Sequence, residues 1–161
     1  MFILDTDILS IFAKAEEIPL LHELFGDDMG MTPAVMHEIA APIDYGYEFP
    51  YAVINTIKSV QMNNEAIAHH QILTQNKKLG KGECEAIAYC KSTSSLFITN
   101  DRKARETAIQ SQVTVISLPA LLRMLILKKI RTKDEVRTLL NKMKKNDYLI
   151  LDPVVENTIF S

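Results

Sequence analysis

Four acidic residues, Asp5, Glu38, Glu85 and Asp101, stand where a carboxylate can do chemistry. Asp5 closes the short apolar run 2–4, and Asp101 follows the apolar run 96–99. Glu38 and Glu85 lie in segments whose apolar residues have helical spacing. Carboxylates gathered in one cleft repel one another unless a cation compensates them, and their hard oxygen atoms favour Mg²⁺ or Mn²⁺. The four residues therefore predict a divalent-metal centre.

A centre of this kind can hydrolyse a phosphodiester. One or two ions lower the pKa of a water molecule, align it with phosphorus and neutralise charge on the departing oxygen. No nucleophilic side chain is then needed, and the sequence has no convincing Ser/His/Asp or Cys/His arrangement. The acids thus favour metal-dependent hydrolysis over covalent catalysis by a side chain.

Each acid also has a purely structural explanation. Asp5 and Asp101 stand where Asp commonly caps the start of a helix. Glu83 and Glu85 both fall in the first turn of a predicted helix, where the helix dipole stabilises an acid by about 0.3–1 kcal/mol. These two point about 200° apart around the helix, so one of them faces the cleft. We assign Glu85 as the ligand, because it shares a face with Ala88, and Glu83 as an outer or capping residue.

The elements that must position these acids follow from the hydrophobic pattern. Short apolar runs alternate with longer segments of helical spacing, which is typical of an α/β fold with a largely parallel sheet. The predicted strands cover residues 2–4, 29–32, 57–61, 96–99 and 113–117. The predicted helices cover residues 6–14, 17–26, 33–41, 64–76, 82–92, 101–111, 118–129 and 132–145. In a parallel sheet, Asp5 and Asp101 would emerge at the same carboxyl edge, where open α/β folds bind ligands.

The composition indicates one globular domain that spans residues 1–161. With 161 residues, 47% of them hydrophobic and 24% charged, the chain can bury one core and is too short for two. We find no signal peptide and no run of the roughly 20 apolar residues that a membrane helix needs, so we expect a cytoplasmic location. Cys84 and Cys90 lie about 240° apart around one predicted helix, and we expect both to be reduced core thiols.

The net charge of −2 hides an uneven distribution. Residues 1–57 carry ten acids and one base, Lys14, whereas residues 58–161 carry ten acids and seventeen bases. This asymmetry suits a metal-binding centre beside a phosphate-binding rim, although two ordinary solvated surfaces would explain it equally well. The bases that flank the predicted ligands in sequence are the candidates for contacting a nucleic-acid backbone. They are Lys81, Arg102, Lys103 and Arg105.

Four fragments, in this order along the chain, resemble the PIN domain family. They are Leu-Asp-Thr-Asp-Ile-Leu at 4–9, Thr-Pro-Ala-Val-Met-His-Glu at 32–38, Gly-Glu-Cys-Glu-Ala-Ile-Ala at 82–88 and Ile-Thr-Asn-Asp-Arg at 98–102. The resemblance implies a three-layer α/β/α fold with a central parallel sheet of about five strands and a C-terminal helical hairpin. It places Asp5, Glu38, Glu85 and Asp101 at the family's acidic quartet, and Thr99 at its accompanying hydroxyl.

Two residues depart from the family's pattern. Asp7 stands where many PIN proteins have Ser or Asn, and could add a second-shell acid beside Glu83. Glu85 takes a position that Asp often holds, which keeps the carboxylate and lengthens its reach. The departures bear on the geometry of the metal centre rather than on its existence.

The resemblance also implies a function and partners. It points to a Mg²⁺- or Mn²⁺-dependent endonuclease of the ribonuclease type that acts on single-stranded RNA, with DNA not excluded. The tail, residues 128–150, looks like the helical ending of a prokaryotic single-domain PIN subgroup. Many small prokaryotic PIN proteins are VapC-like toxins, so a homodimer and an antitoxin protein are the protein partners implied.

The sequence also allows two other functional interpretations. The Asp5-Thr6-Asp7 run also occurs in haloacid-dehalogenase-like phosphohydrolases, where Asp5 would become an aspartyl phosphate, although Leu9 and the lack of a convincing catalytic Lys fit that class poorly. A PIN-like fold could instead bind RNA or a protein without cutting. Whether the four carboxyl groups meet in space distinguishes this binding module from a nuclease.

Overall fold

A parallel β-sheet organises the chain, in a computed structural model that describes residues 1–75 and 77–161. The sheet has the strand order β2-β1-β3-β4 within these residues, and all neighbouring strands are parallel. The strands are β1 (Phe2–Leu4), β2 (Met29–Gly30), β3 (Leu96–Ile98) and β4 (Val115–Ile116). The predicted α/β class and parallel sheet are confirmed.

The strand count differs slightly from the expected five. The predicted strand 57–61 makes a single parallel bridge, between Met31 and Ser59. The Met31 N–H donates to the carbonyl of Lys58, and its carbonyl accepts the Val60 N–H. Pairing cannot continue because Pro33, which has no N–H, begins the next helix two residues later. The edge segment is therefore held by one residue instead of a full strand.

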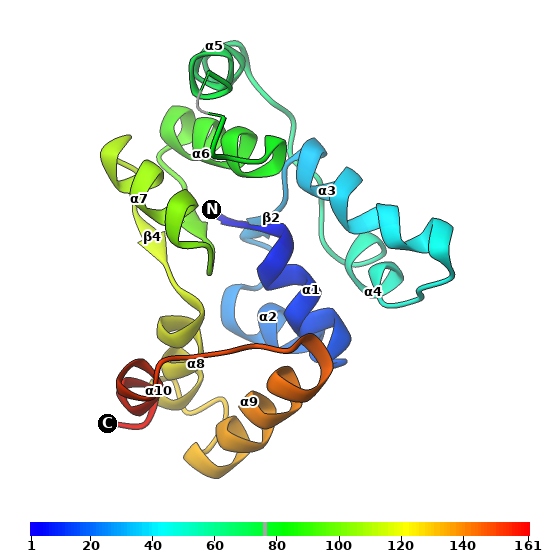
Figure 1. Ribbon diagram of the computed structural model, residues 1–161, viewed down its shortest axis with the longest axis vertical. Coiled ribbons are helices and arrows are strands. Elements are labelled where there is room, and N and C mark those ends of the chain that lie inside the picture. Colours follow the sequence, from blue (N-terminus) through cyan, green and yellow to red (C-terminus); the bar gives the residue numbers. More distant parts are fainter. Residues whose placement is uncertain (76) are drawn as a thin grey trace.

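Helices surround the sheet (Figure 1), and most of them lie where the hydrophobic spacing predicted. They are α1 (Thr6–Lys14), α2 (Ile18–Phe25), α3 (Pro33–Ala40), α4 (Pro50–Ile54), α5 (Asn64–Leu73), α6 (Lys81–Thr93), α7 (Arg102–Gln110), α8 (Leu118–Leu127), α9 (Lys133–Asp147) and α10 (Pro153–Phe160), with a 3₁₀ helix η1 (Ala41–Tyr45). The predicted helix 64–76 ends at Leu73, and its last residue lies outside the described residues. The hydrophobic pattern did not predict η1, α4 or α10.

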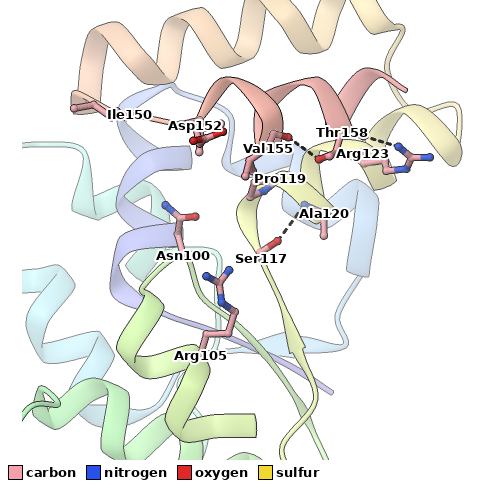
Figure 2. Close-up of a pocket in the computed structure, with 11 residues that line it drawn as sticks. Asn100, Arg105, Ser117, Pro119, Ala120, Arg123, Ile150, Asp152, Val155 and Thr158 are labelled. Atoms are coloured by element: carbon pink, nitrogen blue, oxygen red, sulfur yellow. Dashed lines mark hydrogen bonds between the residues drawn. The ribbon is translucent and has the colours of Figure 1, made fainter.

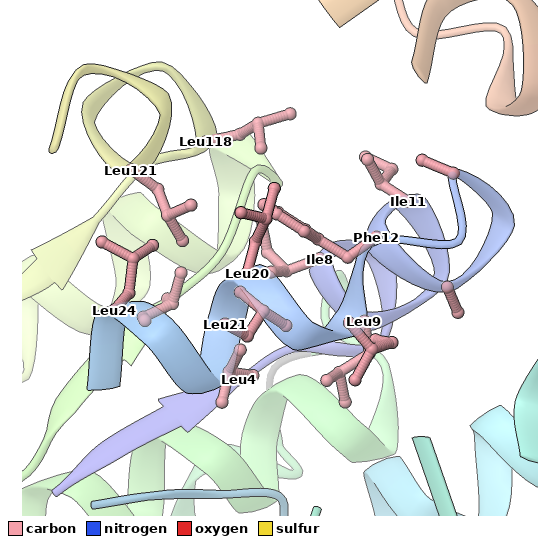
Figure 3. Close-up of a cluster of buried hydrophobic side chains, with 14 of the residues drawn as sticks. Leu4, Ile8, Leu9, Ile11, Phe12, Leu20, Leu21, Leu24, Leu118 and Leu121 are labelled. Atoms are coloured by element: carbon pink, nitrogen blue, oxygen red, sulfur yellow. The ribbon is translucent and has the colours of Figure 1, made fainter. Parts of the chain in front are cut away.

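Strand alternation divides the core into two layers. Leu4 belongs to a buried cluster with residues of α1, α2 and α8 (Figure 3). Ile98 and the buried residues of α9 belong to the same cluster. The strand neighbours of Leu4 and Ile98, which are Ile3 and Phe97, point to the opposite face, against α6 and α7. Successive strand residues face opposite sides of a sheet, so these four residues each bury one side of β1 or β3. The fold has the expected three α/β/α layers.

The strand order reverses beside β1. The chain leaves β1 for β2 on one side and later enters β3 on the other side. Asp5, directly after β1, donates its N–H to the carbonyl of Ile98 at 3.0 Å, which continues the pairing to the carboxyl ends of both strands. Such a switch point is where open α/β sheets form ligand sites. The residues after β1 and β3 therefore share this edge.

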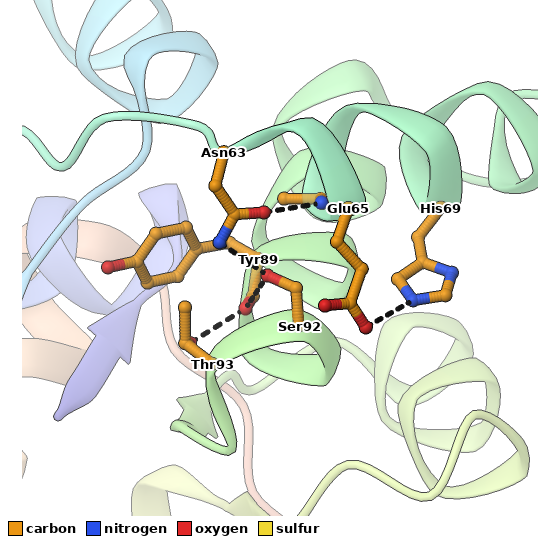
Figure 4. Close-up of polar contacts among 7 residues, drawn as sticks. Asn63, Glu65, His69, Tyr89, Ser92 and Thr93 are labelled. Carbon is orange, nitrogen blue, oxygen red and sulfur yellow. Dashed lines mark hydrogen bonds and ion pairs between the residues drawn. The ribbon is translucent and has the colours of Figure 1, made fainter.

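Polar contacts fasten α5 to α6 (Figure 4). Asn63 caps α5 by accepting the Ala66 N–H at 2.7 Å, and its amide donates to the Ser92 hydroxyl at 3.3 Å. Ser92 and Thr93 in turn donate to the carbonyl of Tyr89. These bonds tie the start of α5 to the end of α6, so that α6 presents its other end, the N-terminus, to the carboxyl edge of the sheet.

The C-terminal helices cover the layer that contains α1. Thr132 and Glu135 form a capping box at the start of α9, as a Thr-x-x-Glu pattern does. The apolar stripe of α9, which includes Val136 and Leu140, is buried in the core, and α9 contacts α1 and α8. The expected C-terminal helical hairpin corresponds to α8 and α9. The additional helix α10 packs against α8.

Both cysteines behave as expected from their spacing. Cys84 and Cys90 are free and buried, and burial raises the pKa of Cys90 to about 12. Neither thiol is therefore ionised at neutral pH. Separately, none of the helices in the described part of the chain is both long and apolar enough to cross a membrane.

Phe12 gives a direct test of the larger core. Its ring is fully buried between α1 and α2, so Phe12→Ala should lower the free energy of unfolding by about 3–5 kcal/mol. Urea unfolding followed by circular dichroism measures this loss. The matched control is Tyr45→Ala, an exposed aromatic residue whose removal should change stability by less than about 0.5 kcal/mol. Equal losses for the two variants would contradict the assigned core.

Candidate metal and nucleic-acid site

Asp5 is a buried carboxylate at the point where the strand order reverses. Its side chain is 3% exposed. One oxygen, Oδ1, accepts the Thr6 N–H at 2.8 Å, and the other, Oδ2, accepts the hydroxyl of Thr99 at 2.7 Å. The fully buried Thr99 hydroxyl also accepts the N–H of Asp101 at 3.1 Å. One hydroxyl thus links the ends of β1 and β3.

Asp101 is the N-cap of α7. Its Oδ1 accepts the Ala104 N–H at 2.7 Å. The capping explanation therefore holds for Asp101 as it does for Asp5, but a cap of this kind occupies one oxygen of the carboxylate. Among the residues that the structure describes, no group donates a hydrogen bond to Oδ2 of Asp101. That oxygen is available to an external ligand.

Glu38 connects three helices. Its Oε2 accepts the hydroxyl of Thr6 on α1, and its Oε1 accepts the N–H of Gly82 on α6 at 3.0 Å. The carboxylate lies so close to Gly82 that a Cβ placed there would be 2.7 Å from both oxygens. Glycine is therefore required at this position for the carboxylate of Glu38 to keep its place at the N-terminus of α6.

The two acids at the start of α6 have different surroundings. Glu85 is 8% exposed, and its Oε1 accepts the Ala34 N–H in the first turn of α3 at 2.7 Å. Thr32, which precedes α3, does not supply this bond: its buried hydroxyl has no partner among the described residues. Glu83 is half-buried and accepts the Gly80 N–H at 2.9 Å. Glu85 is thus occupied with α3.

The environment of Asp5 disfavours its negative charge. Burial raises the pKa of Asp5 from 3.8 to about 7, and the bonds from Thr99 and Thr6 offset only part of that rise. The negative charges of Asp7 and Glu83 raise it further. Glu85 is not among these charges. A carboxylate held in such a place is stabilised by any nearby cation.

Asp7 and Glu83 belong to the same repulsive group. Burial raises the pKa of both carboxyls, and the charges of Asp101 and Glu38 add to the rise in each case. Lys14 lowers the pKa of Asp7, but its ammonium is also paired with Asp147 at the end of α9. Lys14 therefore shares its positive charge between Asp7 and Asp147.

The donor set fits a hard divalent cation. Asp5, Asp7, Glu38, Glu83 and Asp101 offer carboxylate oxygens, the ligands that Mg²⁺ and Mn²⁺ prefer, and their mutual repulsion favours a positive charge between them. Within residues 1–75 and 77–161, no three His, Cys, Asp or Glu side chains approach closely enough to make a preassembled ion site. The four carboxyl groups of the predicted quartet therefore do not meet within reach of one ion in this structure.

The four predicted nucleic-acid-binding bases lie at the starts of α6 and α7. Lys81 and Lys103 are exposed, while Arg102 is exposed and paired with Glu106 at 2.9 Å. Arg105 is half-buried, and its N–H donates to the carbonyl of Asp101 at 3.0 Å. These helix starts are also where Glu83 and Asp101 stand. The structure therefore places the basic residues beside the acids that they flank in sequence.

The sequence reading missed three contributors to this site. Thr6 donates to Glu38, Gly82 admits the carboxylate of Glu38, and Asp147 contributes to the negative field at Asp7. Only Gly82 left a signal, in the Gly-Lys-Gly run, residues 80–82, at the start of α6. Asp147 comes from a helix far away in the chain, and no local pattern indicates that α9 ends near α1.

One comparison with known proteins gives a match over nearly the whole chain. The family model described as a PIN domain covers residues 1–160. The match thus includes all the acids of the cleft and all four strands of the described sheet. No curated protein matches the chain.

The raised pKa of Asp5 predicts how stability depends on pH. Unfolded Asp5 ionises near 3.8 and folded Asp5 near 7, so the folded state holds a proton that the unfolded state releases between these values. Wild-type stability should therefore fall through this window, by about 1.4 kcal/mol per pH unit from this group. Asp5→Asn has no carboxyl group to titrate at this position. Its unfolding free energy relative to the wild type should therefore rise by up to roughly 3 kcal/mol between pH 5 and pH 8.

Urea unfolding of both proteins in the presence of a chelator measures this difference. The chelator ensures that a bound cation does not restore the charged carboxylate. The raised pKa of Asp5 would be contradicted if the difference in unfolding free energy between the two proteins did not change with pH. It would also be contradicted if the wild type became more stable relative to the variant at pH 8.

Proposed function

The chain belongs to the PIN domain family, whose members are generally nucleases, and from this membership we propose that it hydrolyses phosphodiester bonds with Mg²⁺ or Mn²⁺. We propose single-stranded RNA as the substrate and internal cleavage as the reaction. The observation that carries the proposal is the buried carboxyl of Asp5 at the carboxyl end of β1, beside the end of β3 where Asp101 stands. Burial and the charges of Asp7 and Glu83 raise the pKa of Asp5, so a cation would stabilise its ionised form.

The proposed ligands are the predicted quartet, and Asp7 and Glu83, which the sequence analysis named as accompanying acids, lie in its electrostatic field. Asp5, Glu38 and Asp101 remain ligands in this proposal. Glu85 remains the fourth proposed ligand, although its Oε1 accepts the Ala34 N–H in this structure. Glu83 and Asp7 lie within electrostatic range of the other acids, so they act beside the ligands or in contact with the ion. Thr99 holds the carboxylate of Asp5 in place through its hydroxyl.

The residues have separable tasks in hydrolysis. A bound divalent ion would supply a water of lowered pKa and would neutralise the oxygen that leaves phosphorus. Asp5 and Asp101 would hold the ion from neighbouring strand ends, and the bond between Glu38 and Gly82 joins α3 to α6. Asp5 must be ionised to bind the ion, so its pKa of about 7 makes ion binding stronger as pH rises through neutrality.

The bases around the acids support a nucleic acid as substrate. Lys81, Arg102, Lys103 and Arg105 surround the starts of α6 and α7, where a phosphate backbone would approach the ion. Contacts of this kind position a strand without reading its sequence. RNA in preference to DNA rests on the family resemblance, and so do the two protein partners in the proposal, a second copy of the chain and an antitoxin protein.

The first test is metal-dependent cleavage of labelled single-stranded RNA. We expect the wild type to cut in Mn²⁺ or Mg²⁺, and not in a chelator. Asp5→Asn and Asp101→Asn each remove a proposed ligand charge, so each should lower the cleavage rate by at least about 100-fold. Circular dichroism must show both variants folded. A wild type that binds a varied panel of RNAs equally well in chelator and never cuts would establish the binding-module alternative instead.

Gly82→Ala tests the position of Glu38 with little effect on folding. The added methyl group would meet the end of a flexible side chain, so the cost in unfolding free energy should stay below about 1 kcal/mol. The displaced carboxylate should nevertheless lower metal-dependent cleavage by at least about tenfold. Cleavage kinetics and urea unfolding of the same preparation measure the two effects.

Gly80→Ala is the matched control for this variant. A Cβ at Gly80 would make an ordinary contact, 3.8 Å from Oε2 of Glu83, so the activity of this variant should stay within about twofold of the wild type. If both glycine variants cut RNA at the wild-type rate, Glu38 has no part in the reaction.

A further inference from the structure

A cavity of about 590 Å³ lies between α7, α8, α10 and the segment that leads into α10 (Figure 2). Its volume is within the roughly 300–1,000 Å³ typical of small-molecule sites. Asn100 lines the cavity and directly precedes Asp101. The cavity thus begins one residue away from a proposed metal ligand.

Arg105 is a cation in the lining of this cavity. It lies one turn into α7, bonded through its N–H to the carbonyl of Asp101, and its side chain extends toward Asn100 and Ser117 (Figure 2). Among the described residues, the guanidinium of Arg105 makes no ion pair or hydrogen bond. A half-buried guanidinium without an anionic partner favours a phosphate or carboxylate ligand.

The remaining walls combine apolar and polar surface. Pro119, Ile150 and Val155 present apolar side chains, and Ile150 and Val155 are exposed. Asp152 is the acid in the lining, and its Oδ1 caps α10 by accepting the Val154 N–H at 2.8 Å. A base can lie on such aliphatic side chains while its phosphate reaches a cation. The cavity therefore offers apolar side chains to the base of a nucleotide and a guanidinium to its phosphate.

Arg123 keeps α10 in place as one side of this cavity. Its Nη1 donates to the carbonyl of Thr158 and to the hydroxyl of Ser161. The residue stands on α8, so these bonds join α8 to the end of α10 across the cavity wall (Figure 2). Arg123 is a positioning residue here, because its Nη1 is bonded to α10.

We propose that this cavity binds the nucleotide adjacent to the phosphodiester that is cut, with its phosphate on Arg105 and its base against Pro119, Ile150 and Val155. The inference rests on the proposed nuclease function and adds a substrate subsite to it. The helix α10, which no element of the sequence reading anticipated, thereby becomes part of the nucleic-acid surface. A single strand fits this site, because the base must leave its stack to enter.

The test compares neighbouring residues of α10. Val155 lines the cavity and is 40% exposed, whereas Val154 is 73% exposed and does not line it. Val155→Glu and Val154→Glu add the same charge one residue apart, and both positions tolerate a polar side chain. Arg105→Gln is paired in the same way with Lys91→Gln, which removes one positive charge from the far end of α6. Thermal unfolding must show that all four variants are folded.

The primary measurement is binding of a labelled single-stranded RNA by fluorescence anisotropy in chelator. Val155→Glu and Arg105→Gln should each raise the dissociation constant by about fivefold or more, and the two controls by less than about twofold. With Mn²⁺, the loss in kcat/KM of Val155→Glu should be at least about fivefold larger on RNA than on bis(p-nitrophenyl) phosphate, a small phosphodiester that does not need a second subsite.

The outcomes separate this inference from the proposed function. If the wild type cuts neither substrate, the nuclease proposal fails, and the anisotropy series still decides whether the cavity holds RNA. If Val155→Glu and Val154→Glu weaken RNA binding equally, or if neither does, the subsite is overturned. It is also overturned if the wild type binds no RNA, or if Val155→Glu loses the same fraction of activity on both substrates.

Discussion

The rest of this structure depends on burying the carboxylate of Asp5 where the strand order reverses. An isolated buried charge is costly, and here burial moves the pKa of the group to about 7. The protein offsets part of that cost with the Thr6 N–H and the Thr99 hydroxyl, and the same hydroxyl receives the Asp101 N–H. The start of α1, the end of β3 and the start of α7 are thereby held in fixed relation. A cation would remove the remaining cost, so function and stability oppose each other in the ion-free protein.

A second constraint acts through close packing of a charged group against backbone. Glu38 lies between α1 and α6 because Thr6 and Gly82 both donate to it, and because residue 82 has no side chain. The contacts between α5 and α6 fix the other end of α6. The polar contacts with α5 therefore hold the C-terminal end of α6, and Glu38 holds its N-terminal end. Rigid support of this kind is what an arrangement of several ligands requires.

Much of the fold could be read from the sequence, because its signals are local. The run from Phe2 to Asp5 and the spacing of Ile8, Leu9 and Phe12 contain a strand and a helix with the cap between them, and both appear as predicted. The edge strand 57–61 was overestimated, because an apolar run does not reveal that Pro33 ends the pairing of its neighbour. At the site, the positions of Asp5 and Asp101 followed from strand ends. The partners of Glu85 and Glu38 did not, since they depend on how α3 and α6 meet.

The bond between Glu85 and α3 links two positions that are far apart in the chain. The first turn of α3 receives its acceptor from Glu85, while the hydroxyl of Thr32 stays without a partner among the described residues. An Asp at position 85 would be shorter by one methylene and would leave the Ala34 N–H buried and unpaired, unless residue 32 became a working cap. In related chains with Asp at position 85, the side chain of residue 32 should accordingly accept the N–H of residue 34, a bond that Thr32 does not make here. Residue 32 would then begin the helix that Glu85 begins in this chain.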